Sequence, residues 1–234
     1  SSLSGPFYLG IEAGGTRTTV CLANAAGEPV WQHEAGPANL RLLTDEQLLK
    51  HFRSLTALPE TPAAIGIGMA GARTVADRER IVKAAAQVWT GIPCHPTNDL
   101  ETALLAEPLS NPQKPLPRVL VLSGTGSCCF GQSPDGTSSK VGGWGHILGD
   151  KGSGYEIGLR GLKACVYYLD RDGEWSGLGQ RILRALQLNE PNDLIGWVQQ
   201  SPKNEIAALA IEVFAAAIEK DEIAKDILEG AAHS

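Results

Sequence analysis

Two short loops rich in glycine and threonine carry residue types suited to binding phosphate groups. They are Gly14-Gly15-Thr16 and Ser123-Gly124-Thr125-Gly126-Ser127. Each lies between two apolar segments and therefore joins two consecutive expected strands. A tight turn of small residues exposes several backbone N–H groups on one side, and a threonine hydroxyl adds a further donor. One such turn is most often only a hairpin, but two in matching layouts predict a bound nucleotide.

Asp99 is a candidate general base. It follows a short expected strand, 94–98, and precedes an expected helix, 100–106. A carboxylate at the end of a strand can point into a cleft and take a proton from a substrate. An aspartate just before a helix is also a common N-cap, whose side chain accepts a backbone hydrogen bond. The spacing leaves both interpretations open.

The segment 142–155 concentrates residue types found in sugar sites. Seven of its fourteen residues are Gly or Ser, and Trp144, His146 and Asp150 stand among them. An aromatic ring can cover the apolar face of a sugar, while a carboxylate accepts hydrogen bonds from hydroxyl groups. The alternatives are a core anchor for Trp144 and an ordinary loop histidine for His146. We predict a function for Asp150 and the glycines, and the role of His146 stays open.

Two other nucleotide motifs do not explain the chain. No G-x-x-x-x-G-K-[ST] sequence is present, so the glycine loops are not Walker A motifs. The segment Gly66–Gly71 has the spacing of a dinucleotide fingerprint, but the acidic residue expected about 20 positions later is missing, and Asp99 lies too far on. We interpret Gly66–Gly71 as a strand that ends in a tight turn beside the site.

The elements expected to position these residues begin with strands 7–13, 16–22 and 29–33. Their short connecting turns make them antiparallel. Strands 63–69 and 94–98 then alternate with helices 45–58, 75–89 and 100–106. An antiparallel start followed by alternating units predicts an α/β fold, a mixed sheet with helices on its faces.

The second half of the chain repeats this layout without repeating the sequence. A connector with four prolines, 108–117, leads into strands 118–122, 128–132 and 140–144. Beyond residue 153 the sequence is mainly helical, and the segment 205–232 carries an apolar stripe at helical spacing. We therefore predict two domains, 1–107 and 118–234, and expect the second to be truncated because no further strand follows its opening three.

Composition narrows the classes of partner. The 234 residues are 43% apolar and 20% charged, as in a globular protein. A net charge of -6 without a run of Lys or Arg argues against nucleic acid and anionic membranes as partners. The five cysteines include no C-x-x-C pair, which favours reduced thiols over disulfides or zinc. Without an apolar run of about 18 residues or a signal peptide, we expect a cytoplasmic protein.

Taken together, the motifs resemble the N-acetylglucosamine kinase and BadF/BadG/BcrA/BcrD ATPase family, within the actin-like ATPase superfamily. The resemblance covers nearly the whole chain and rests on Gly10–Thr18, Leu122–Ser127 and Gly142–Tyr155. The motif around Trp144 is specific to the family, whereas the others are shared across the superfamily. The resemblance implies two ribonuclease-H-like domains with sugar and Mg-ATP in the cleft, and phosphorylation of the sugar at its 6-hydroxyl.

The resemblance also implies roles for individual residues. Asp99 resembles the base that takes the proton of the sugar hydroxyl, and Glu12 resembles the residue that orients Mg²⁺ through water. The residues that match nucleotide phosphate binding are Gly14, Gly15, Thr16, Ser123, Gly124, Thr125, Gly126 and Ser127. Those that match sugar binding are Asn39, Asp99, Thr125, Trp144, Gly145 and Asp150.

Two departures from the family pattern leave alternatives. Ala13 stands where a third glycine is common, and the C-terminal adenosine-binding segment of the family has no counterpart, so the activity of this chain is open. One alternative is a regulatory module that binds sugar or nucleotide without turnover. Another is an ATPase activator of a dehydratase, which needs cysteines for an iron–sulfur cluster; the adjacent Cys128-Cys129 pair does not suit one. The sequence does not choose among N-acetylglucosamine, glucosamine and N-acetylmuramic acid as the substrate. It also leaves open whether the protein forms a homodimer.

Overall fold

The computed structural model describes residues 5–106 and 116–234. It divides into two compact units, Ser1–Pro115 and Leu116–Ser234. Most of the predicted connector, residues 108–115, lies outside the described residues. Each unit has a core of its own and is described by itself below.

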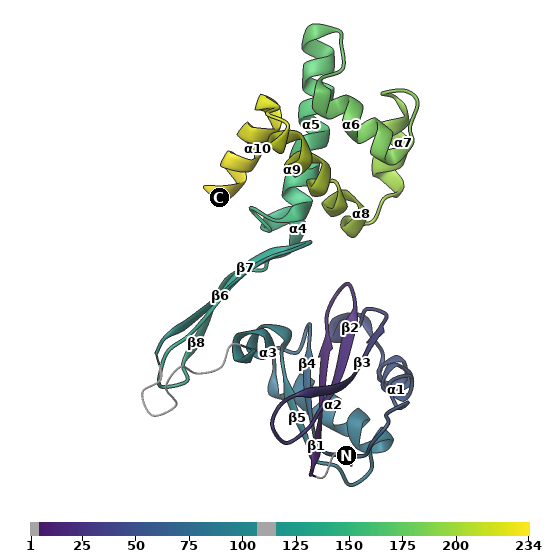
Figure 1. The fold of residues 1–234 in the computed structure, drawn as a ribbon, viewed down its shortest axis with the longest axis vertical. Helices are drawn as coiled ribbons and strands as arrows, with labels where there is room; N and C mark the ends of the chain where they lie inside the picture. The colour runs from purple at the N-terminus through teal and green to yellow at the C-terminus, as the bar shows by residue number, and fades with distance from the viewer. Residues whose placement is uncertain (1–4, 107–115) are drawn as a thin grey trace. The chain divides into compact units, whose positions relative to one another are not determined.

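The first unit is built on a five-stranded mixed sheet in the order β3-β2-β1-β4-β5 (Figure 1). Its strands are β1 Phe7–Ala13, β2 Thr18–Ala23, β3 Pro29–Ala35, β4 Pro62–Met69 and β5 Cys94–Thr97. Strands β1, β2 and β3 pair antiparallel, whereas β4 runs parallel to β1 and β5 runs parallel to β4. The predicted mixed sheet is therefore confirmed, with its antiparallel start.

Two helices and one 3₁₀ turn connect these strands, and a third helix follows β5. They are η1 Leu40–Leu42, α1 Asp45–Arg53, α2 Val75–Val88 and α3 Asp99–Leu105. Thr44 caps α1: its hydroxyl accepts a hydrogen bond from the Gln47 N–H at 3.2 Å, and the Gln47 side-chain oxygen accepts one from the Thr44 N–H at 2.9 Å. The predicted extent of this helix, 45–58, is wrong because α1 ends at Arg53 and the chain turns at Ser54.

The two faces of the first sheet are covered by different helices. Leu9 and Ile11 point from β1 into a core that includes Phe52 of α1 and Ile81 of α2. The opposite face is met by α3, because a Cβ atom at Gly68 of β4 would overlap the side chain of Thr102. The close approach of α3 explains the glycine at position 68, and the positive φ of +85° explains the glycine at position 71.

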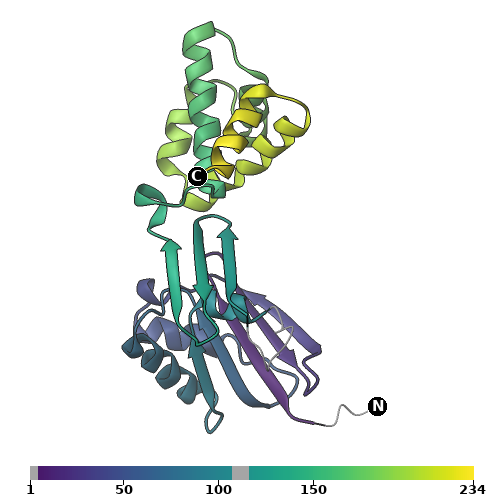
Figure 2. The ribbon, with the colours of Figure 1, turned by 90° about the vertical axis from the view of Figure 1, so that its left-hand side faces the viewer.

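The second unit opens with a three-stranded antiparallel sheet in the order β6-β7-β8 (Figure 2). The strands are β6 Arg118–Ser123, β7 Ser127–Gln132 and β8 Ser138–Gly142. Strand β8 ends two residues before the predicted end, because Gly142 and Gly143 have positive φ angles of +80° and +71°. Trp144 therefore lies outside the strand.

Seven helices follow in the second unit. They are α4 Gly145–Leu148, α5 Gly154–Asp172, α6 Gly177–Leu186, α7 Asp193–Gln200, α8 Lys203–Ala208, α9 Ala210–Ile218 and α10 Glu222–Ala232. The segment predicted as helical, 205–232, is thus broken into three helices. Its predicted stripe is confirmed in part, since Ile206, Leu209 and Val213 are buried in the second core. Among the described residues, no helix combines the length and apolar character that a membrane span requires.

Candidate functional site

The carboxyl ends of β1, β4 and β5 place three of the predicted site residues at one edge of the first sheet. Parallel pairing aligns Glu12 with Gly68, and Gly68 with Thr97, across these strands. Asp99 follows two residues after Thr97, and Asn39 forms an isolated parallel bridge with Ala70, the residue after β4. The carboxyl edge of such a sheet is where ligands of α/β proteins bind.

Glu12 and Asp99 influence each other electrostatically. Burial is the main cause that raises the pKa of the partly buried Glu12 above its ordinary value, and the negative charge of Asp99 raises it further. The positive charge of Arg17 opposes this and lowers the pKa. Two carboxylates that share one partly buried place are expected to attract a cation.

Asp99 is not the N-cap of its helix, so that interpretation of the residue is wrong. Asn98 caps α3: its side-chain oxygen accepts the Glu101 N–H at 2.7 Å, and the Glu101 carboxylate accepts the Asn98 N–H at 3.2 Å. Arg78 holds Glu101 in place through an ion pair of 2.9 Å. Capping therefore does not account for the Asp99 carboxylate, which lies in the first turn of the helix.

The Glu12 carboxylate, with the negative charge of Asp99 nearby, suits a magnesium ion better than a metal held by protein side chains alone. Within residues 5–106 and 116–234, no group of three or more His, Cys, Asp or Glu side chains could hold a metal ion. Mg²⁺ needs fewer protein ligands, because it keeps several waters and binds one or two carboxylates together with substrate phosphates. The donor set at this edge matches that pattern.

The first glycine loop, between β1 and β2, leaves two N–H groups available. Gly14 closes the turn, since its N–H donates to the Arg17 carbonyl at 2.9 Å and its own carbonyl accepts the Ala38 N–H at 3.0 Å. Gly15 and Thr16 are exposed, and in the described part of the chain their N–H groups donate no hydrogen bond. A Cβ atom at Gly14 would lie 3.5 Å from the Glu12 carboxylate, so the loop and that carboxylate are neighbours.

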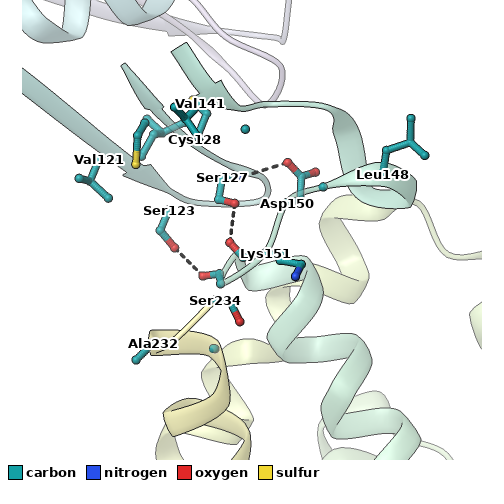
Figure 3. A pocket seen from close by; sticks show the side chains of 16 residues that line it. Val121, Ser123, Ser127, Cys128, Val141, Leu148, Asp150, Lys151, Ala232 and Ser234 are labelled. Atoms are coloured by element: carbon teal, nitrogen blue, oxygen red, sulfur yellow. Dashed lines mark hydrogen bonds between the residues drawn. The ribbon is translucent and has the colours of Figure 1, made fainter. Parts of the chain in front are cut away.

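The second glycine loop, between β6 and β7, is fastened to the segment that follows β8 (Figure 3). The Ser123 hydroxyl donates to the Gly152 carbonyl at 2.8 Å, and the Ser127 hydroxyl donates to the Lys151 carbonyl at 2.6 Å. These two hydroxyls are therefore used within the protein. Among the described residues, the N–H groups of Thr125 and Gly126 have no acceptor, which leaves them available to a ligand.

Asp150 faces the second glycine loop, as Figure 3 shows. Its side chain is 5% exposed, and its Oδ1 accepts the Ser127 N–H at 3.1 Å. Its Oδ2 pairs with the Lys203 ammonium at 2.5 Å. A Cβ atom at Gly126 would lie 2.8 Å from Oδ1, so a larger residue there would push against this carboxylate. Lys203 was not a predicted site residue, because no local signal connects it to a residue 53 positions earlier.

Trp144 lies directly before the short helix α4, and His146 lies within it, ahead of Asp150. Trp144 is 74% exposed, so its interpretation as a core anchor is wrong. An exposed indole next to a positive-φ glycine, Gly145, is available to stack on a ligand. The His146 ring packs edge-on against the Tyr155 ring, with 4.9 Å between ring centroids.

Two pockets of the second unit border its glycine loop. One, of about 520 Å³, is lined by Ser123, Ser127 and Asp150 together with the end of α10 (Figure 3). The other, of about 640 Å³, is lined by Gly124 and by apolar side chains such as Ile211 and Phe214. Both volumes lie in the range of small-molecule sites.

Comparison with known proteins gives consistent matches. The sequence profile of the BadF/BadG/BcrA/BcrD ATPase family matches residues 105–234. An N-acetylmuramic acid/N-acetylglucosamine kinase of Clostridium acetobutylicum is 33% identical over 97% of this chain and 76% of its own length. An N-acetyl-D-glucosamine kinase of Dictyostelium discoideum is 29% identical over 99% of this chain and 77% of its own.

A solved structure agrees with these matches. It is the crystal structure of a Chromobacterium violaceum protein provisionally named N-acetylglucosamine kinase. It is 26% identical to this chain and superposes with a TM-score of 0.76, covering 97% of this chain and 79% of its own. The match extends over both units, so the fold of each half has a counterpart in a single known protein.

Proposed function

The chain belongs to the BadF/BadG/BcrA/BcrD ATPase family, and we propose that it transfers the terminal phosphoryl group of ATP to the 6-hydroxyl of an amino sugar. Both curated relatives are named for kinases of N-acetylglucosamine, and one also for N-acetylmuramic acid. N-acetylglucosamine is therefore the substrate that we would test first. We also propose a cytoplasmic location, because ATP is supplied there.

The observation that carries the proposal is the Glu12 carboxylate beside the first glycine loop, with Asp99 close enough to raise the pKa of Glu12. We propose that Asp99 takes the proton of the sugar hydroxyl as the phosphoryl group is transferred. Glu12 would hold Mg²⁺ through water, and the bound ion supplies neutralisation of the phosphate charges. The free N–H groups of Gly15 and Thr16 would position the phosphates.

We propose that the second unit supplies further contacts to both substrates. The free N–H groups of Thr125 and Gly126 would bind phosphate, and the apolar pocket beside Gly124 has room for the nucleoside. The Trp144 ring would stack on the sugar, and Asn39 and Gly145 would bind its polar groups. Asp150 would contribute to the sugar site through the loop that it holds at Ser127. We propose each unit as one ribonuclease-H-like domain, with boundaries at 1–107 and 118–234.

The test is ADP release from Mg-ATP with a panel of hexosamines that differ at the amine and at O3. We expect sugar-dependent release, with N-acetylglucosamine among the substrates. Asp99→Asn should reduce kcat by at least about 10²-fold with sugar binding retained, because the base would be lost. Asp45→Asn is the matched control, since Asp45 also begins a helix directly after a capping-box residue.

Other results would favour the alternatives. A melting temperature that rises with sugar, without ADP release, would indicate a binding module that does not turn over. ATP hydrolysis that no sugar stimulates would instead favour the activator type of ATPase. An equal loss of activity in Asp99→Asn and Asp45→Asn would contradict the catalytic role of Asp99.

A further inference from the structure

We propose that Lys203 is a positioning residue that holds the second glycine loop in its phosphate-binding shape. The inference rests on the proposed function, which makes this loop a phosphate site. Lys203 is the first residue of α8, in the helical part of the second unit, and belongs to none of the motifs of the family resemblance. It would act through Asp150 and not by touching a substrate.

The geometry joins Lys203 to the loop through a single buried carboxylate. The Lys203 ammonium lies 2.5 Å from Asp150 Oδ2, and Asp150 Oδ1 accepts the Ser127 N–H at 3.1 Å. The two oxygens of Asp150 thus divide between the lysine and the loop. Since the carboxylate is 5% exposed, water has little access to replace either partner.

The packing around Asp150 makes its orientation matter for the loop. The carboxylate lies so close to Gly126 that a Cβ atom there would be 2.8 Å from Oδ1. Asp150 also holds a positive φ of +57°, a conformation that surrounding contacts must maintain in a residue other than glycine. Without Lys203 the buried charge would lose its cationic partner and turn toward solvent. The Ser127 N–H would then lose its acceptor, and the free N–H groups of Thr125 and Gly126 would change direction.

A second set of contacts places Lys203 beside the tryptophan motif. Its ammonium lies 5.9 Å from the centroid of the Tyr155 ring, and His146 packs against the same ring, at 4.9 Å between centroids. The lysine is therefore fixed by an aromatic ring as well as by Asp150. Lys203 therefore connects helix α8 and the segment around His146 to the second glycine loop.

The experiment compares Lys203→Met with Lys203→Arg and with a control, Lys225→Met. Lys225 forms an ion pair of the same length, 2.5 Å, with Glu222, and its side chain is 38% exposed against 32% for Lys203. We expect Lys203→Met to raise KM for ATP and to lower kcat/KM by about 10²-fold, since the loop amides would be misplaced. Lys203→Arg should recover most of the loss, and Lys225→Met should change neither constant.

Hydrogen exchange of the Ser127 amide gives a readout that does not need catalysis. Exchange measured by NMR should accelerate in Lys203→Met, because the amide loses its acceptor, and should stay unchanged in Lys225→Met. Unchanged Ser127 exchange in Lys203→Met would overturn the proposal whatever the activity shows. The proposal would also be overturned if kcat fell in proportion to the amount of folded protein while KM stayed constant. If the unsubstituted chain releases no ADP, the proposed function fails, while the exchange of Ser127 still decides whether Lys203 positions the loop.

Discussion

At the scale of single residues, the carboxylates of Glu12 and Asp99 make a prediction about proton binding. Asp99→Asn removes a negative charge, so the pKa of Glu12 should fall, but not to its ordinary value, because burial is the larger cause of the rise. The Glu12 side-chain carbon followed by NMR through an acid titration would measure it.

Arg17 provides a control of opposite sign for this prediction. Its positive charge lowers the pKa of Glu12, so Arg17→Gln should raise that pKa further. If both substitutions moved the pKa in the same direction, a change of burial and not of charge would be the cause. If Asp99→Asn left the pKa of Glu12 unchanged, the two carboxylates would not be the neighbours that the proposed active site requires.

A second prediction at the residue scale concerns the stability cost of adding a side chain at Gly126. Gly126→Ala would place a Cβ atom 2.8 Å from the Asp150 carboxylate, and both the loop and Asp150 would have to move. We expect a loss of about 1–3 kcal/mol in the free energy of unfolding, as is typical of an overpacked site. Urea unfolding would measure it, with Gly124→Ala as the control because a Cβ atom there has no neighbour within 4 Å. Equal stability of the two variants would show that the loop yields easily at Gly126.

At the scale of elements, the start of α2 depends on one carboxylate. Hydrogen bonds from the N–H groups of Arg73, and next of Thr74, lower the pKa of Asp77 from its ordinary 3.8 to about 2. Arg41 also pairs with it, at 2.7 Å. A carboxylate with a lowered folded-state pKa stabilises the fold above its unfolded pKa. This stability should therefore be lost as the pH falls from about 4 through about 2.

Asp77→Asn should remove that dependence on pH. At neutral pH we expect the variant to lose about 2 kcal/mol, the usual strength of hydrogen bonds to a charged group. Urea unfolding between pH 2 and pH 5 would then show a shallower fall in stability than in the unsubstituted chain. A parallel curve would mean that other carboxylates carry the acid sensitivity.

The elements also show which local rules could be applied to the sequence alone. The capping box of Thr44 and Gln47 was predictable because both partners lie within one turn. The sequence left Asp99 open between a general base and an N-cap, because aspartate is a good N-cap; in the structure Asn98 takes that place, with Glu101 three residues later completing the capping box. The expected helix boundaries were better at the start than at the end, as α1 shows: it begins at Asp45 as predicted but ends at Arg53 and not at residue 58.

At the scale of the whole molecule, the contacts that the sequence could not predict join distant segments. The glycine loops and Asp150 were identified from their residue types, but Asp150 faces the loop at Ser127 and pairs with Lys203, 53 residues later. The exposure of Trp144 depends on where β8 ends, which is set by the φ angles of Gly142 and Gly143. Contacts of this kind follow from tertiary packing, and no local period or motif encodes them.

The sheets of the two units should differ in how strongly their backbone amides are protected from hydrogen exchange. In the first, β1 lies between β2 and β4, and its Leu9 and Ile11 are buried. In the second, β6 is an edge strand among the described elements, and Val119 and Val121 are 70% and 71% exposed. Backbone hydrogen bonds at an exposed edge open more readily than those in a buried strand. We therefore expect amide exchange to be slow in β1 and β4 and fast in β6.

A fragment of residues 1–115 extends this prediction. The first unit has a core of its own, built from both its sheet and its helices α1 and α2, so the fragment should fold without the rest of the chain. Exchange measured by mass spectrometry on fragment and whole chain should then give the same slow rates in β1 and β4. Faster rates in the fragment would mean that the second unit stabilises the first. Equal protection of β6 and β1 in the whole chain would mean that the edge of β6 is covered in solution.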